Sequence, residues 1–152
     1  MHVKELLDRK EITSIYSVSP EASVFEAVAG MVEKNVGAML VVRDGQLHGI
    51  ITECDYLRLV TVMGRTARDT PVHEVMTRRV IYVEPDATAD EAMSIMTEKR
   101  IRHLPVLAGE RILGVVSIGD LVKAQTETRE LQIRTLEAYI ADQYPGPADA
   151  AE

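Results

Sequence analysis

The chain contains an internal repeat, and this repeat constrains the possible folds more than any other feature. When the sequence is shifted against itself by 65 residues, residues 18–55 align with residues 83–120 without a gap, and 11 of the 38 pairs are identical. Chance would give about two or three identities at average residue frequencies. The chain is therefore a tandem duplication, and a repeat of this kind decides the architecture before any local assignment is made.

Each copy predicts the same order of elements: strand, helix, strand, strand, helix. A β-branched run opens each copy, at 15–18 and 80–83, and a proline two residues later ends it. A capping box then precedes an amphipathic helix, and two apolar runs around a turn predict a hairpin. The last helix begins at Thr52 or Ser117. We expect an α/β (α+β) fold of two β-α-β-β-α units related by a pseudo-two-fold axis.

The repeats also divide the chain into segments. A repeat of about 60 residues buries too little surface to be stable alone, so we expect the two copies to pack together and to leave two related crevices. The predicted segments are 1–62, the first repeat with a short N-terminal helix; 63–79, a connector; 80–126, the second repeat; 127–143, a longer C-terminal helix; and 144–152, a flexible tail.

Composition excludes several classes of protein. The 152 residues are 46% hydrophobic and 27% charged, which supplies a core and excludes a disordered chain. The single cysteine, Cys54, excludes an internal disulfide or a cysteine metal cage. A net charge of −7 argues against nucleic-acid binding, and no apolar run approaches the roughly 18 residues of a membrane helix. We expect a cytoplasmic protein, bound to neither nucleic acid nor membrane and without a metal site.

Each copy carries a hydroxyl residue and an aspartate at the start of its last helix, within residues 49–55 and 114–120. The simpler interpretation is an ordinary capping box, a very common pattern. The functional interpretation places Asp55 and Asp120 at the mouth of a crevice, where a carboxylate accepts both hydroxyls of a ribose. The helix N–H groups would then face a phosphate.

Basic residues distinguish the second copy from the first. Arg100, Arg102 and His103 directly precede a predicted buried strand, while the equivalent residues 35–38 carry no charge. Cations near the end of a helix also suit its dipole, which is the alternative interpretation for Arg100. Beside a carboxylate that binds ribose, the cluster suits a nucleotide phosphate. The two crevices are therefore not equivalent.

Together these features resemble the cystathionine-β-synthase (CBS) domain, in the tandem pair called a Bateman module. The resemblance rests on the unit order, the Val-x-Pro after the first strand and the Gly-apolar-apolar-Thr/Ser-x-x-Asp motif, and it covers about residues 3–143. Segments 98–106 and 117–122 resemble the small stand-alone bacterial CBS-pair proteins especially closely. The resemblance implies a non-enzymatic regulatory module, usually a homodimer, that binds AMP, ADP, ATP, NAD(H) or sometimes S-adenosylmethionine.

The resemblance also implies two sets of binding residues. Similar proteins often have arginine where this chain has Cys54, which removes a cation from the first site. The first site would be formed by Asp55 and Thr52, which hold ribose, with Ile15, Tyr16, Gly37, Ala38, Met39 and Glu53. The second would be formed by Asp120 and Ser117, with Val80, Ile81, Arg100, Arg102, His103, Leu104, Pro105, Ile118 and Gly119.

Two alternatives stand beside this hypothesis. The seven methionines and the C-terminal helix offer apolar surface for a ligand-independent interaction scaffold. An enzyme that uses Cys54 is the second alternative, but no histidine neighbours this cysteine in sequence, and no metal-ligand spacing or glycine-rich phosphate loop occurs. We predict an adenine-nucleotide sensor that signals through its crevice or its dimer contacts to a regulated protein that the sequence does not identify.

Overall fold

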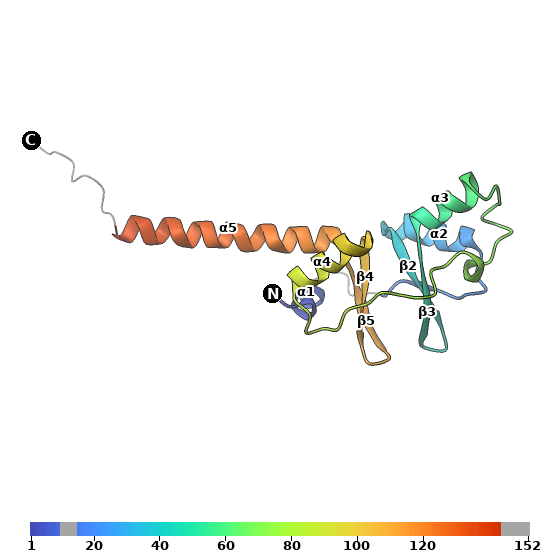
Figure 1. The fold of residues 1–152 in the computed structure, drawn as a ribbon, viewed down its shortest axis with the longest axis horizontal. Coiled ribbons are helices and arrows are strands. Elements are labelled where there is room, and N and C mark those ends of the chain that lie inside the picture. Colours follow the sequence, from blue (N-terminus) through green and yellow to red (C-terminus); the bar gives the residue numbers. More distant parts are fainter. Residues whose placement is uncertain (10–14, 144–152) are drawn as a thin grey trace, which may run out of the picture.

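The computed structural model describes residues 1–9 and 15–143, and it confirms the predicted α/β fold of two tandem units (Figure 1). The predicted tail, 144–152, lies outside the described residues. The elements in chain order are α1 (Val3–Arg9), β1 (Ser17–Val18), α2 (Val24–Lys34), β2 (Ala38–Arg43), β3 (Gln46–Thr52), α3 (Glu53–Thr61), the 3-10 helix η1 (Val72–Glu74), α4 (Ala89–Lys99), β4 (His103–Ala108), β5 (Arg111–Ser117) and α5 (Ile118–Gln143).

The hairpins are the best-predicted elements. β2 pairs antiparallel with β3, and β4 with β5. The first turn is made by Asp44 and Gly45, which both have positive φ, as a tight hairpin turn requires. Each hairpin has one register irregularity, and the two lie at equivalent positions of the aligned repeats, at Val41/Val42 and Val106/Leu107.

The opening strands are shorter than predicted. β1 forms only two residues of the run 15–18, and an isolated bridge between Val83 and Val106 replaces the predicted strand of the second repeat. In the first repeat, the N–H of Leu40 donates to the carbonyl of Tyr16 at 3.2 Å. The equivalent of Leu40 is Pro105, which has no N–H and cannot make this bond. The proline therefore leaves the second repeat with a single bridge.

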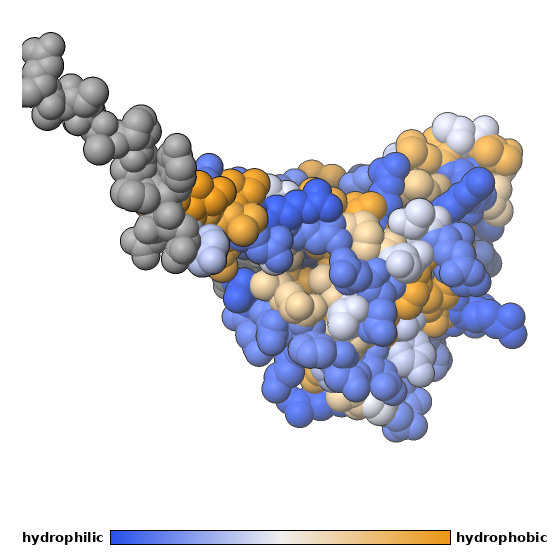
Figure 2. All heavy atoms as spheres, turned by 60° about the vertical axis from the view of Figure 1, so that its left-hand side comes forward, coloured by the Kyte–Doolittle hydropathy of each residue, from blue (hydrophilic) through white to orange (hydrophobic). Residues whose placement is uncertain are grey.

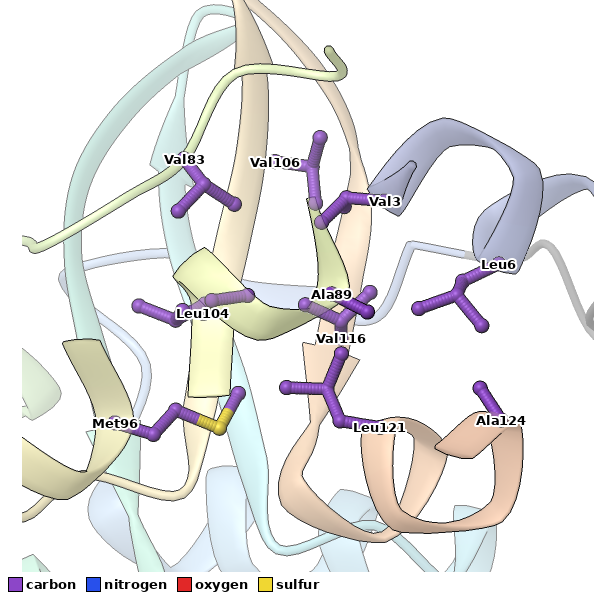
Figure 3. Close-up of a cluster of buried hydrophobic side chains, with 11 residues drawn as sticks. Val3, Leu6, Val83, Ala89, Met96, Leu104, Val106, Val116, Leu121 and Ala124 are labelled. Carbon is purple, nitrogen blue, oxygen red and sulfur yellow. The ribbon is translucent and has the colours of Figure 1, made fainter. Parts of the chain in front are cut away.

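A short segment precedes each repeat, and each of these leading segments packs against the other repeat. α1 precedes the first repeat and packs against the second, whereas the segment around η1 precedes the second repeat and packs against the first. The N–H of Val3 donates to the carbonyl of Ala87 in the second repeat, and the N–H of Val72 donates to that of Ala22 in the first, both at 2.8 Å. Val3 and Val72 are both fully buried. Figure 3 shows Val3 and Leu6 of α1 within the core of the second repeat.

The division predicted from the sequence followed chain order and assigned the N-terminal helix to the first repeat, 1–62. In the structure this helix packs against the second repeat. The repeats align at a shift of 65 residues, but the two leading segments align at a shift of 69, so the repeat search did not pair them. Each repeat completes its core with a segment that precedes the other repeat. The two halves therefore depend on one another for burial.

Two hydrophobic clusters form the interior, one in each repeat. The first contains Val24, Ala27, Met31, Met39, Val41, Ile51, Leu59, Val72 and Met76. The second contains Val3, Leu6, Val83, Ala89, Ala92, Met96, Leu104, Val106, Val116, Leu121 and Ala124.

The last helix of the second repeat and the predicted C-terminal helix, 127–143, form one continuous helix, α5, of 26 residues. No glycine or proline occurs between Gly119 and Gln143 to end it. Its first turns bury Leu121 and Ala124, whereas its outer part projects from the rest of the molecule and exposes apolar surface (Figures 1 and 2). None of the helices in residues 1–9 and 15–143 is long and apolar enough to cross a membrane.

Candidate functional site

The hydroxyl and aspartate of each repeat form a hydrogen-bonded pair where the hairpin enters its helix. The N–H of Thr52 donates to Oδ2 of Asp55 at 2.8 Å, and the Thr52 hydroxyl donates to the same oxygen at 3.3 Å. In the second repeat, the N–H of Ser117 donates to Oδ2 of Asp120 at 2.7 Å, and the N–H of Asp120 donates to Oγ of Ser117 at 3.2 Å. Both carboxylates therefore cap their helices, as the simpler interpretation predicted.

The start of each hairpin is tied to the same helix. The N–H of Glu53 donates to the carbonyl of Gly37 at 3.1 Å, and the N–H of Ile118 donates to that of Arg102 at 2.9 Å. The strand register also places Ala38 opposite Thr52, and the start of β4 opposite the end of β5 in the same way. These bonds bring the predicted residues of one repeat to one end of its hairpin.

The two predicted sites meet where the repeats touch. A β-carbon placed on Gly37 would lie 3.2 Å from Cε1 and 3.3 Å from Nε2 of His103, and 3.5 Å from Oε1 of Glu53. The glycine of the first repeat thus leaves room for an imidazole of the second. Because Gly37 and Glu53 belong to the first predicted site and His103 to the second, a ligand in either site would border the same contact.

Asp55 is only 8% exposed, so its charge needs compensation within the protein. Hydrogen bonds from Thr52 supply part of it, and NH1 of Arg58 lies 3.7 Å from Oδ1 of Asp55. Arg58 was missing from the predicted site. Its spacing of three residues from the aspartate, within one helix, was the signal that could have identified it. Asp120 is half-buried.

The apolar site residues at the starts of β2 and β4 are turned into the protein. Met39, Leu104 and Pro105 are buried. Leu104 is fully buried, so neither its side chain nor its backbone is open to a ligand in this position. Ile81 is half-buried and packs against the second core, beside the half-buried Val80.

The remaining predicted residues lie nearer the surface. Ile15 is exposed, and Tyr16 has the ammonium of Lys34 5.7 Å from the centre of its ring. Arg102 is exposed, and so is Arg100, which ends α4 with a left-handed φ of 55°. The other exposed positions, at the starts of α3 and α5, are Glu53, Cys54, Ile118 and Gly119.

Two surface hollows lie away from the predicted site residues. One, of about 390 Å³, is lined mainly by apolar residues of α2 and by Tyr56 and Ala67. The other, of about 270 Å³, lies on the first repeat between its hairpin and the segment around η1. Neither is lined by a residue of the two predicted sites. Within the described part of the chain, no group of three His, Cys, Asp or Glu side chains is placed to hold a metal ion.

Comparisons with family models, with related sequences and with solved structures all identify the same family. The family model described as "CBS domain" matches residues 3–61 and 72–127. The CBS domain-containing protein CBSX3, mitochondrial, of Arabidopsis thaliana is 42% identical over 127 residues. That alignment covers 80% of this chain and 62% of the relative, so the chain spans less than two thirds of the relative's length.

Solved structures show the same fold. A putative signal-transduction protein with CBS domains from Burkholderia ambifaria MC40-6 superposes with a TM-score of 0.79 and 45% identity, over 82% of this chain and 93% of that chain. The CBS domain pair of protein MJ0100 superposes with a TM-score of 0.72 and 25% identity, over 82% and 98% of the two chains. That pair was solved in complex with 5′-methylthioadenosine and S-adenosyl-L-methionine.

Proposed function

This chain belongs to the CBS domain family, and from that premise we propose that it is a regulatory module that binds an adenine nucleotide, AMP, ADP, ATP or NAD(H), where its two repeats meet. The observation that carries the proposal is the duplicated pair of a hydroxyl residue and an aspartate at the starts of α3 and α5. Both ligands of the MJ0100 pair contain adenosine, which supports adenosine as the common part of the ligand.

The capping role of the aspartates is compatible with ribose binding. A carboxylate has two oxygens with about four acceptor positions, and the cap engages Oδ2. A ribose presents two adjacent hydroxyl donors, which one carboxylate accepts together. The cap fixes the orientation of Asp55 or Asp120 before the ligand arrives, which lowers the entropy lost on binding.

The second site is the better candidate for a phosphorylated ligand. Arg102 and His103 stand at the start of β4, whereas Gly37 and Ala38 occupy the equivalent positions in β2. The N–H of Ile118 donates to the backbone carbonyl of Arg102, so the residue that carries this cation lies beside the start of α5. Both attract phosphate oxygens. We propose that AMP binds the second site more tightly than the first.

A structural change caused by nucleotide binding would be transmitted to other proteins through protein–protein contacts. Five large apolar side chains in the outer part of α5 are between 54% and 66% exposed. We propose that this part of α5 contacts a second copy of the chain or the regulated protein. The same observation favours the alternative function, an interaction scaffold that needs no ligand. The five residues are Leu131, Ile133, Leu136, Tyr139 and Ile140.

Nucleotide titration monitored by thermal unfolding and calorimetry tests the proposal. At a hundredfold excess over its dissociation constant, a bound nucleotide raises the free energy of unfolding by about 2.7 kcal/mol. Asp120→Ala should remove the tight AMP site. Glu91→Ala is the matched control, because Glu91 also caps a helix, accepting from the N–H of Thr88 at 2.8 Å, but lies outside both sites.

The outcomes separate the candidate functions. Asp120→Ala and Glu91→Ala should cost similar stability, about 0.5–2 kcal/mol for a lost cap, and only Asp120→Ala should lower affinity. If AMP, ADP, ATP and NAD(H) all fail to stabilise the wild type, the sensor proposal is wrong and the scaffold is favoured. Conversion of a bound nucleotide would instead indicate an enzyme. Mass spectrometry of the nucleotide that co-purifies with the protein would identify the ligand.

A further inference from the structure

The hollow of about 270 Å³ on the first repeat gathers basic side chains. It lies at the turn end of the β2–β3 hairpin, opposite the end that carries Thr52 and Asp55. Arg43 and His48 come from the hairpin, and His73 and Arg78 come from the segment around η1. A net charge of −7 makes four basic groups around one hollow unusual for this chain.

Both arginines of the hollow are held in place. Arg43 forms an ion pair with Glu21, and the Ser19 hydroxyl donates to Oε2 of Glu21 at 2.6 Å. NH2 of Arg78 donates to the backbone carbonyl of His73 at 3.2 Å. A guanidinium has five N–H donors, so these contacts orient each arginine and use only part of its hydrogen-bonding capacity. Glu21 also lines the hollow, and its carboxylate offsets the charge of Arg43. Arg78 keeps a positive charge in the hollow that the two imidazoles also line.

The hairpin fold itself does not require Arg43 and His48. In the second repeat, Ala108 and Leu113 occupy the positions equivalent to Arg43 and His48. The hairpin there has the same pairing and the same number of residues in each strand. Arg43 and His48 are therefore not needed to form the hairpin, and a basic pair at this position suits an anion.

We propose that this hollow binds a phosphate group, either free phosphate or the phosphate of a small monoester. Charged donors from two arginines, with imidazoles beside them, suit a dianion with at least three strong acceptor oxygens, whereas a carboxylate offers two oxygens. The hollow is larger than one phosphate ion and leaves room for an organic group. It is separate from the proposed nucleotide site and would stand if that site were disproved.

The four histidines provide the test, because two line the hollow and two do not. NMR spectra of the imidazole rings of the full chain are recorded during titration with inorganic phosphate, at constant pH and constant ionic strength. We expect the rings of His48 and His73 to shift along saturable curves with one dissociation constant. His2 lies elsewhere and should not shift. Any shift of His103 should follow a different curve, because it would report the nucleotide site.

Matched arginine variants test the residues. Arg78→Gln should weaken phosphate binding about tenfold, the effect of removing one charge-assisted hydrogen bond. Arg79→Gln, the adjacent exposed arginine outside the hollow, should leave the binding unchanged. Thermal unfolding of both variants checks that they fold. Linear shifts without saturation, equal shifts of all four histidines, or equal effects of the two variants would overturn the proposal.

A third titration identifies the source of the phosphate. Glycerol 3-phosphate that binds more tightly than inorganic phosphate would assign the hollow to a phosphate monoester. Equal affinities would assign it to free phosphate. Acetate, at the same ionic strength, should bind at least tenfold more weakly than phosphate. Acetate that binds as tightly as phosphate would refute a site built for a phosphate group.

Discussion

The imidazole ring of His103 lies against Gly37, where the two repeats meet. A β-carbon on Gly37 would be 3.2 Å from Cε1 of His103, closer than most real contacts of a β-carbon. Gly37 does not have a positive φ, so its backbone conformation is open to other residues. The glycine therefore provides space for the ring rather than a special backbone conformation.

The first prediction is that the effect of Gly37→Ala on stability changes sign when the His103 ring is removed. In a His103→Ala background, Gly37→Ala should stabilise the protein by about 0.4–1 kcal/mol, because alanine reduces the freedom of the unfolded chain. In the wild-type background, the same substitution should destabilise it, because the ring must move. Chemical denaturation of the four proteins measures the coupling, which should exceed about 0.5 kcal/mol. An identical effect of Gly37→Ala in both backgrounds would mean that the ring does not control this position.

The second prediction compares two equivalent glycines. A β-carbon on Gly49 would lie 2.7 Å from Sδ of Met76 and 2.8 Å from the backbone carbonyl of Thr77. A β-carbon on Gly114 would meet only the end of the Leu7 side chain, at 3.0 Å. A flexible side chain can rotate away, whereas a hydrogen-bonded backbone cannot.

Gly49→Ala should therefore destabilise the protein by about 1–3 kcal/mol, the usual cost of overpacking, and Gly114→Ala by clearly less. The midpoint of urea unfolding measures both effects. Equal costs at the two positions would show that the backbone around Thr77 yields as readily as the Leu7 side chain.

Sequence reasoning succeeded where the signal is local. The aligned copies and the turn at Asp44 and Gly45 predicted the hairpins, and a spacing of three residues predicted the capping pairs. It failed where one proline changes the hydrogen bonding of a strand. Pro105 lies within the aligned repeat, and only the geometry of the parallel pair shows that its missing N–H shortens the opening strand of the second copy.

The remaining failures involve residues that are distant in sequence. The contact between Gly37 and His103 joins positions 66 residues apart, and it depends on how the repeats are placed. The two leading segments also pack against repeats that the alignment does not pair with them. The stretch between a leading segment and the repeat that follows it is four residues longer in the first copy than in the second. Periodicity and spacing describe a chain within one repeat, so neither relationship was visible in the sequence.

The third prediction tests the exchange of the leading segments. Val3→Ala should cost about 2 kcal/mol, because it removes buried apolar surface from the second core. Hydrogen exchange should then show a larger loss of protection in β4 and β5 than in β2 and β3. Val72→Ala is the matched variant in the first core, and it should show the opposite pattern. If Val3→Ala weakened the first repeat more than the second, the exchanged arrangement would be wrong.

The last prediction concerns the difference between the two proposed nucleotide sites. Arg102→Ala should weaken AMP binding about tenfold, the loss of one charge-assisted hydrogen bond, and should change adenosine binding little, since adenosine has no phosphate. Arg129→Ala, an exposed arginine of α5, is the control and should affect neither ligand. The preference for AMP over adenosine should also fall as salt is added, because ions screen an exposed guanidinium. Calorimetry of Asp55→Ala and Asp120→Ala assigns each site. If Asp55→Ala removed the tight AMP site and Asp120→Ala did not, the tighter site would belong to the first repeat, and the argument from Arg102 and His103 would fail.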